Sequence, residues 1–175
     1  MLKSPHYAKP QTVTSNFMTT LILKEKTDKL FETGFVSFYN LTFAPTTSTE
    51  NVLASFLDTN NYPIIEPESL GRPFNLDKLK PTDFKILSKN ELTSFLKDFA
   101  DPKGWTNKDE IVRQVKYISN VFNQLDTEFF HIISPSFFEM HDPRIDIIGH
   151  VYVYYYIILA ITADNKITVC NMVMD

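Results

Sequence analysis

The segment IIGHVYVYYYIILAITA, residues 147 to 163, constrains the fold most strongly, because its seventeen positions contain no Asp, Glu, Lys or Arg. A membrane-spanning helix needs about twenty apolar residues and places its tyrosines near the two membrane interfaces. Here four tyrosines lie inside the run, His150 lies near its start, and β-branched residues are frequent. These features favour a buried β-strand over a membrane span.

Alternate side chains of a strand point to opposite faces of its sheet, so this strand has two faces. The first is an ordinary apolar core face, made by Val151, Val153, Tyr155, Ile157, Leu159 and Ile161. The second carries imidazole and hydroxyl groups among apolar residues and is made by His150, Tyr152, Tyr154, Tyr156, Ile158 and Ala160. The second face suits a covering helix, the wall of a pocket or a partner interface.

The period of two extends to the segments on either side of this strand. Residues 129–138 and 166–174 also alternate, and short polar connections join the three segments. We therefore predict three successive antiparallel strands at the C-terminal end of the sequence. If Asp164 and Asn165 are the central residues of a type I′ turn, Leu159 faces Cys170 across the hairpin.

Helical spacing dominates the middle of the sequence. The best helix covers residues 107–125, where apolar residues recur at steps of three or four. These apolar residues are Ile111, Val115, Ile118, Phe122 and Leu125. Two capping boxes, Ser88 with Glu91 and Thr47 with Glu50, predict the starts of two further helices.

The N-terminal part contains one clear strand and two less regular stretches. Residues 35–43 alternate aromatic and β-branched side chains, which predicts a strand. Residues 15–33 fit a helix that begins near Ser15 and ends at Gly34, and they also fit a strand followed by a turn; we expect the helix. Residues 60–81 contain prolines throughout and predict a long loop.

These elements predict an α+β fold: a curved antiparallel sheet, made of the C-terminal three-stranded meander and at least one N-terminal strand, with helices packed mainly on one face. Residues 1–14 are expected to form an extended arm, and residues 15–175 a single domain. The order of elements resembles that of cone-shaped folds of the nuclear-transport-factor-like kind. The resemblance implies a sheet that encloses a pocket, and it implies no particular activity.

Composition narrows the classes of function. The net charge of −4 and the mixed signs around Lys24 and Lys26 argue against nucleic-acid binding, which needs clustered basic residues. Cys170 is the only cysteine, so we expect a buried structural thiol and no disulfide. The first residues lack a secretory signal pattern, which favours a cytoplasmic protein. No motif for a cofactor occurs, and we predict none.

The candidate ligand site lies around the start of the apolar run. The residues predicted to bind a ligand are His150, Tyr152, Tyr154 and Tyr156, with Glu139 and Asp146 assisting. An imidazole beside a carboxylate can serve as an acid or a base. The spacing of these groups fixes no metal geometry, so we predict no metal site. Asp142 is expected to start a turn, with Arg144 pairing with a carboxylate.

Two functions are compatible with these observations. We expect a non-enzymatic protein-binding module, for example a small cytosolic inhibitor or immunity-type protein that occludes a partner, because catalytic motifs are absent and aromatic residues are abundant. Exposed contacts are expected on the long loop, at Tyr62, Ile64, Ile65 and Phe74. The alternative is a small ligand-binding protein or enzyme with a pocket on the face of the predicted strand that carries His150.

Overall fold

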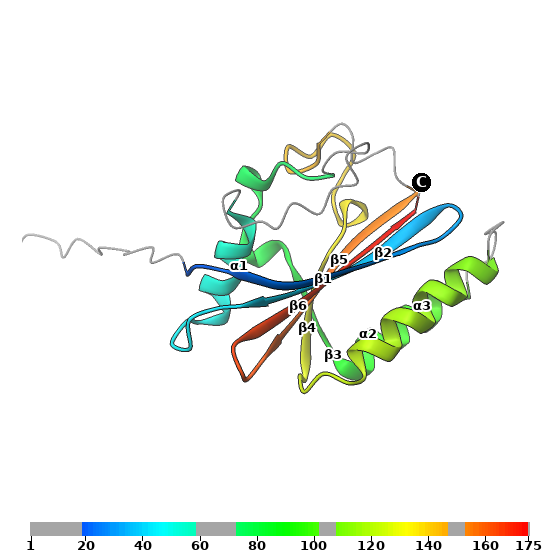
Figure 1. Cartoon of the computed structure of the whole chain (residues 1–175). Helices are drawn as coiled ribbons and strands as arrows, with labels where there is room; N and C mark the ends of the chain where they lie inside the picture. Colours follow the sequence, from blue (N-terminus) through cyan, green and yellow to red (C-terminus); the bar gives the residue numbers. More distant parts are fainter. Residues whose placement is uncertain (1–18, 59–72, 102–107, 147–152, 175) are drawn as a thin grey trace, which may run out of the picture.

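The fold is built on one open sheet of six antiparallel strands (Figure 1). The computed structural model describes residues 19–58, 73–101, 108–146 and 153–174. Within these residues the strands are β1 (Ile22–Leu30), β2 (Gly34–Thr42), β3 (Lys85–Ser88), β4 (Phe129–Ile133), β5 (Tyr154–Thr162) and β6 (Lys166–Met174). Their order across the sheet is β1-β2-β6-β5-β4-β3, so β1 and β3 form its edges. The predicted C-terminal meander is present as β4, β5 and β6.

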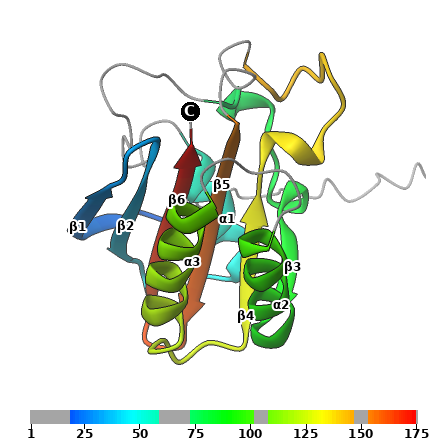
Figure 2. The ribbon, with the colours of Figure 1, turned by 90° about the vertical axis from the view of Figure 1, so that its right-hand side faces the viewer.

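Helices cover both faces of the sheet, two on one face and one on the other. The described helices are α1 (Thr49–Leu57), α2 (Lys89–Ala100) and α3 (Lys108–Phe122). Helices α2 and α3 lie side by side in front of the sheet in Figure 2, and α1 lies behind it. The predicted α+β class, with an antiparallel sheet and helices mainly on one face, is therefore confirmed.

Strand β5 contains the second half of the apolar run and is buried on both faces. On the side of α1 its buried residues are Tyr155, Ile157 and Leu159. On the side of α2 and α3 they are Tyr154, Ile158 and Ala160. The predicted alternation is confirmed, and each face belongs to a separate hydrophobic core. Among the described residues, none of the helices is long and apolar enough to cross a membrane.

The helix predicted for residues 15–33 is wrong, because Ile22–Leu30 form the edge strand β1. Every residue of β1 is exposed, and among the described strands β2 is its only neighbour in the sheet. A strand exposed on both faces needs no apolar alternation, so its sequence carries no period of two that distinguishes it from a helix. Its lysines and a register shift between Leu23 and Glu25 protect this edge from pairing with another chain.

The predicted register of the last hairpin is wrong by one residue. The turn has three residues between Thr162 and Lys166, and Asn165 adopts a positive φ of 60°. This three-residue loop replaces the predicted two-residue turn, because Asn tolerates the left-handed conformation that the loop needs. Cys170 therefore faces Ile158, not Leu159, and lies on the side of α2 and α3. It is fully buried, which raises the pKa of its thiol.

Of the two predicted capping boxes, the one made by Ser88 and Glu91 forms and the one made by Thr47 and Glu50 is wrong. The Ser88 hydroxyl accepts from the Glu91 backbone at 3.3 Å, and the Glu91 carboxylate accepts from the Ser88 backbone at 2.7 Å. That capping box is therefore confirmed. At α1 the capping side chain is Ser48, while the Thr47 hydroxyl bonds to another threonine.

The loop predicted for residues 60–81 is described only from Pro73 onward. There it contains two short 3-10 turns, η1 (Leu76–Lys78) and η2 (Pro81–Asp83). The strand β3 follows directly and was not predicted. Four residues are too few to show a period of two, and the first two residues of β3 are exposed.

Candidate functional site

The tyrosine face of β5 packs against α2 and α3. Two of the four residues predicted to bind a ligand there lie outside the described residues, namely His150 and Tyr152. Tyr154 is buried, and its hydroxyl donates to Gln114 Oε1 on α3 at 2.9 Å. Tyr156 is half-buried, and its ring centroid lies 5.3 Å and 5.5 Å from those of Phe95 and Phe99. The described half of this face is a packed aromatic layer.

The two carboxylates predicted to assist lie in the loop before β5. Glu139 is exposed at the surface of this loop. Asp146 is half-buried, and its backbone N–H donates to the Pro73 carbonyl at 3.1 Å.

Tyr154 and Tyr156 are neighbours, with ring centroids 6.3 Å apart. The structure thus brings the two described tyrosines together and leaves Glu139 in contact with solvent.

Arg144 organises the loop between β4 and β5. Its guanidinium donates to the two oxygens of Asp142 at 2.9 Å and 2.6 Å, and to Asp83 of η2 at 2.8 Å. The hydrogen bonds from Arg144 lower the pKa of Asp142 to about 2. The predicted turn at Asp142 and the pairing of Arg144 with a carboxylate are confirmed. The bond from Arg144 to Asp83 fastens this loop to η2, and the bonds from Arg144 to Asp142 stabilise the turn within the loop.

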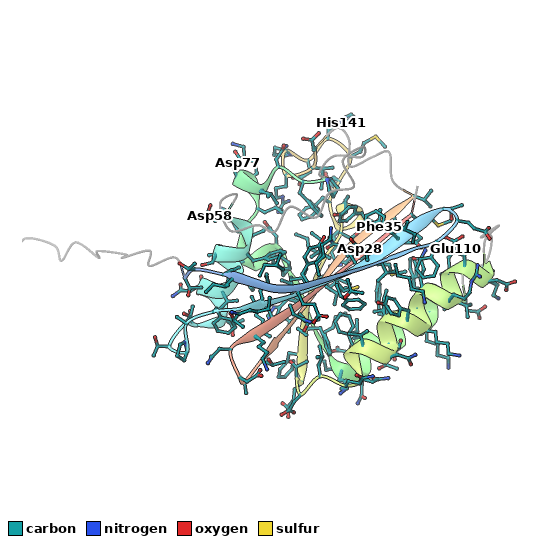
Figure 3. All side chains as sticks on the ribbon, in the orientation of Figure 1. Asp28, Phe35, Asp58, Asp77, Glu110 and His141 are labelled. Carbon is teal, nitrogen blue, oxygen red and sulfur yellow. The ribbon has the colours of Figure 1, made fainter. Side chains whose placement is uncertain are left out.

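A buried polar cluster joins α3 to the turn between β1 and β2. Glu110, labelled in Figure 3, is 3% exposed, and its Oε1 accepts from the backbone N–H and the hydroxyl of Thr33, both at 3.0 Å. The same oxygen accepts from Gln114 Nε2 at 3.4 Å, and Gln114 accepts from Tyr154. We call these four residues the Glu110 cluster. Glu110 Oε2 is buried with no hydrogen-bond partner among the described residues.

The predicted partner contacts on the long loop are described at one position only. Three of them lie outside the described residues: Tyr62, Ile64 and Ile65. Phe74 is 3% exposed, and its ring centroid lies 6.4 Å from those of Phe138 and Tyr155. Phe74 is therefore a core residue on the side of α1 in this structure.

A hollow of about 600 Å³ lies at the β3 edge of the sheet. Its apolar wall includes Ile86, Phe129 and Ile161, and its rim includes the carboxylates of Asp126 and Glu128. Ile86 is 62% exposed and Phe129 is 54% exposed, so both present apolar surface to solvent. No Lys or Arg is among the described residues that line it. We call this site the acidic hollow.

His131 lines the acidic hollow from β4. It pairs with Ile86 of β3 and Leu159 of β5, so its side chain lies on the α1 side of the sheet. It is 7% exposed, and its Nδ1 is buried with no hydrogen-bond partner among the described residues. Burial lowers the pKa of His131, so the imidazole is neutral near pH 7. Helix α1 contributes only its first residue, Thr49, to the described lining of this hollow.

The acidic hollow has the composition of a contact surface. An exposed aromatic ring next to an aliphatic side chain offers apolar area to a partner, and a rim of carboxylates favours positive charge. In the part of the chain that the structure describes, no group of three His, Cys, Asp or Glu side chains could hold a metal ion. The described features of this site that a ligand can contact are its apolar wall and its negative rim.

Known proteins give no guide to this site. No family model, no curated protein and no solved structure matches the chain. The choice between functions therefore depends on the geometry of the hollow and of the Glu110 cluster.

The sequence pattern revealed neither the Glu110 cluster nor the acidic hollow. Glu110 lies in the first turn of a helix, where an acidic residue usually stabilises the helix dipole from the surface. Its burial depends on Thr33, which is 77 residues away in sequence. One signal was present: Glu110 and Gln114 are four residues apart and each precedes a residue of the buried stripe, Ile111 or Val115. Polar residues at the border of an apolar stripe can be buried with it.

Proposed function

We propose that this chain is a non-enzymatic protein-binding module and that it binds its partner through the acidic hollow. The observation that carries this proposal is the exposure of Phe129 and Ile86 beside Asp126 and Glu128. Exposed apolar groups that line a concave surface are typical of contact sites, and aromatic side chains often dominate the binding energy. The partner that fits presents an apolar side chain flanked by Lys or Arg.

A small cytoplasmic inhibitor or immunity-type protein is the role that best fits this surface. The net charge of −4 favours the approach of a basic partner, because complementary charge raises the association rate. The wall of the hollow is formed by residues of β3, β4 and β5, which are held by the hydrogen bonds of the sheet. A surface that is already ordered loses little conformational entropy on binding, which suits a protein that occludes its target.

Site-specific photocrosslinking tests this proposal in the cells that produce the protein. A photoreactive phenylalanine analogue replaces Phe129 in one variant and Val112 in the control variant. Val112 is also apolar and exposed, at 41%, but it lies on α3, on the other side of the sheet. We expect position 129 to yield one adduct with a protein whose crosslinked surface is basic, and position 112 to yield none.

Two outcomes would contradict the proposal. If both positions give the same adducts, contact at Phe129 is not specific. If position 129 crosslinks only to a second copy of this chain, the acidic hollow is an interface between copies and not a site for a basic partner.

A ligand pocket on the tyrosine face is a second candidate function, and the Glu110 cluster favours it. A buried acceptor such as Glu110 Oε2, which has no partner among the described residues, is often satisfied by a bound group. If a ligand donor binds there, small amines or alcohols should raise the melting temperature of the wild type more than that of Tyr154→Phe, which lacks the hydroxyl. Equal shifts in both proteins, or none in either, would count against this pocket.

A further inference from the structure

A second hollow, of about 680 Å³, lies between α3 and the turn that joins β1 to β2. Its basic side chains are Lys29, Arg113 and Lys116, and its aromatic side chains are Phe31 and Tyr117. Lys29 pairs with Val36, which belongs to the core under α2 and α3, so this hollow lies on the opposite side of the sheet from the acidic hollow. We call it the basic hollow.

Positive charge predominates among the described residues that line the basic hollow. Glu32 is the only carboxylate among the described lining residues, against three cations. Arg113 and Lys116 make no ion pair with a described residue. By contrast, Lys108, which is also on α3, pairs with an aspartate at 2.8 Å. Cations that outnumber the carboxylates around them repel one another, and an anion that binds between them relieves this repulsion.

The spacing of the polar residues on α3 suits a single bound group. Arg113, Lys116 and Asn120 follow one another at steps of three and four, so they lie on one face of the helix. A guanidinium can donate two parallel hydrogen bonds to a phosphate, an ammonium adds a point charge, and an amide adds a neutral donor. These groups supply the donors that a tetrahedral dianion needs.

The aromatic side of the basic hollow is held in place by its neighbours. The Lys29 ammonium lies 4.6 Å from the centroid of the Tyr117 ring and 5.7 Å from that of Phe31. The Tyr117 ring in turn meets Phe38 edge to face, with centroids 5.6 Å apart. Burial raises the pKa of Tyr117, so its hydroxyl stays protonated and adds no negative charge. The cation of Lys29 is therefore positioned before a ligand arrives.

We infer that the basic hollow is a binding site for the phosphate group of a phosphorylated small molecule. Arg113 and Lys116 bind the phosphate oxygens, Lys29 adds charge from the β1 side, and Asn120 donates from the next turn of α3. The remaining volume of the hollow, beside Phe31 and Tyr117, receives the organic part of the ligand. This site is independent of the acidic hollow and of the protein partner proposed for it.

Titration of the full chain with adenosine triphosphate and, separately, with inorganic pyrophosphate tests this inference. We expect saturable binding of both at low ionic strength, weaker binding at high ionic strength, and shifts of the amide resonances of residues 29–32 and 113–120. Tighter binding of the nucleotide would indicate that Phe31 and Tyr117 contact an organic group. Equal affinities would indicate that only phosphate is recognised, and the site would then be assigned to free phosphate ions instead of a phosphorylated small molecule.

Matched charge-neutralising variants separate a built site from general attraction. Arg113→Gln and Lys116→Gln should each lower the affinity by about tenfold, since each removes a charged hydrogen-bond donor. Lys97→Gln removes the same charge from an exposed position on α2 and should leave the affinity unchanged. The inference is overturned if the wild type binds neither compound, or if Lys97→Gln weakens binding as much as the two variants on α3.

Discussion

The two hollows occupy opposite sides of the same sheet and differ in almost every property that matters for recognition. The acidic hollow combines exposed apolar side chains with two carboxylates and no described cation. The basic hollow combines three cations with aromatic rings that are already engaged by a lysine. The first is suited to the burial of apolar area by a protein, and the second to a small anion.

The difference shows that a net charge does not reveal where on the surface each kind of ligand can bind. The sum of −4 hides two local surfaces of opposite sign, because Lys29 and Arg113 are brought together only by the fold. The expectation of no nucleic-acid binding concerns a long polyanion, which needs an extended basic surface. It does not extend to a single phosphate group, which three converging cations can neutralise.

The largest effect is expected from Glu110, because the Glu110 cluster holds the turn between β1 and β2 against α3. Glu110→Ala leaves the buried donors of Thr33 and Gln114 without this acceptor and should lower the free energy of unfolding by about 2 kcal/mol. The same variant should bind phosphate more weakly at the basic hollow, while crosslinking from position 129 in the acidic hollow should persist. Chemical denaturation and titration measure the two effects.

The control variant Glu110→Gln keeps Oε1 as an acceptor and should lose less stability than Glu110→Ala. Equal losses of stability in both variants would contradict the assigned role of Oε1.

The next effect is expected from Phe129, on the other hollow. Phe129→Ser should weaken binding to the protein captured by crosslinking by about tenfold, because a truncated aromatic anchor loses apolar contact area. Binding of pyrophosphate should not change. Since Phe129 is more than half exposed, the melting temperature should change little. Surface plasmon resonance measures the affinity, and a loss of pyrophosphate binding in this variant would show that the two hollows are not independent.

A smaller effect is expected from the carboxylates at the rim of the acidic hollow. Asp126→Asn combined with Glu128→Gln should slow association with a basic partner severalfold and alter dissociation less, since charges at a rim act mainly on the encounter. The effect should decrease as salt is added. Stopped-flow kinetics at two ionic strengths measures it. An unchanged association rate would mean that the partner is not selected by charge.

The smallest effect is expected from the titration of His131. Burial lowers its pKa below the ordinary value of 6.5, so near pH 6 the unfolded chain binds more protons at this position than the folded chain. The contribution of His131 to stability is therefore complete above about pH 6.5 and declines as the pH falls through the range between the two pKa values. Denaturation at pH 7.5 and pH 5.5 should show this decline in the wild type and a weaker one in His131→Gln. Identical pH dependence in the two proteins would contradict it.

Elements with one buried stripe or one clear period could be predicted from sequence. The stripe of α3 and the alternation of β5 are visible because burial repeats at 3.6 or two residues. The two edge strands could not be predicted, because neither shows a clear period of burial. Strand β1 is exposed on both faces, and β3 has only four residues. The hairpin register depended on the conformation of Asn165, which a dipeptide pattern does not determine.

Two of the residues predicted to bind a ligand, Tyr154 and Tyr156, lie on the same side of β5. Tyr154 makes a buried polar contact there. Its partner Gln114 comes from a helix 40 residues away in sequence, so no local pattern could supply it. Both hollows likewise combine distant segments, such as Ile86 with Phe129 or Lys29 with Arg113. Residues from distant segments meet in this way because of how the fold arranges the strands and helices, so the sequence alone does not show which of them lie together.

The buried thiol of Cys170 can report how often the core around it opens to solvent. It is the only thiol in the sequence, and it lies on β6 between Phe38 of β2 and Ile158 of β5, with no exposed surface. A thiol reagent can reach it only when α2 and α3 move away from the sheet or the central strands separate, so its labelling rate measures how often this core opens. A cysteine introduced at an exposed position such as Met140 would react much faster. A dye can therefore be attached there while the natural cysteine stays in place.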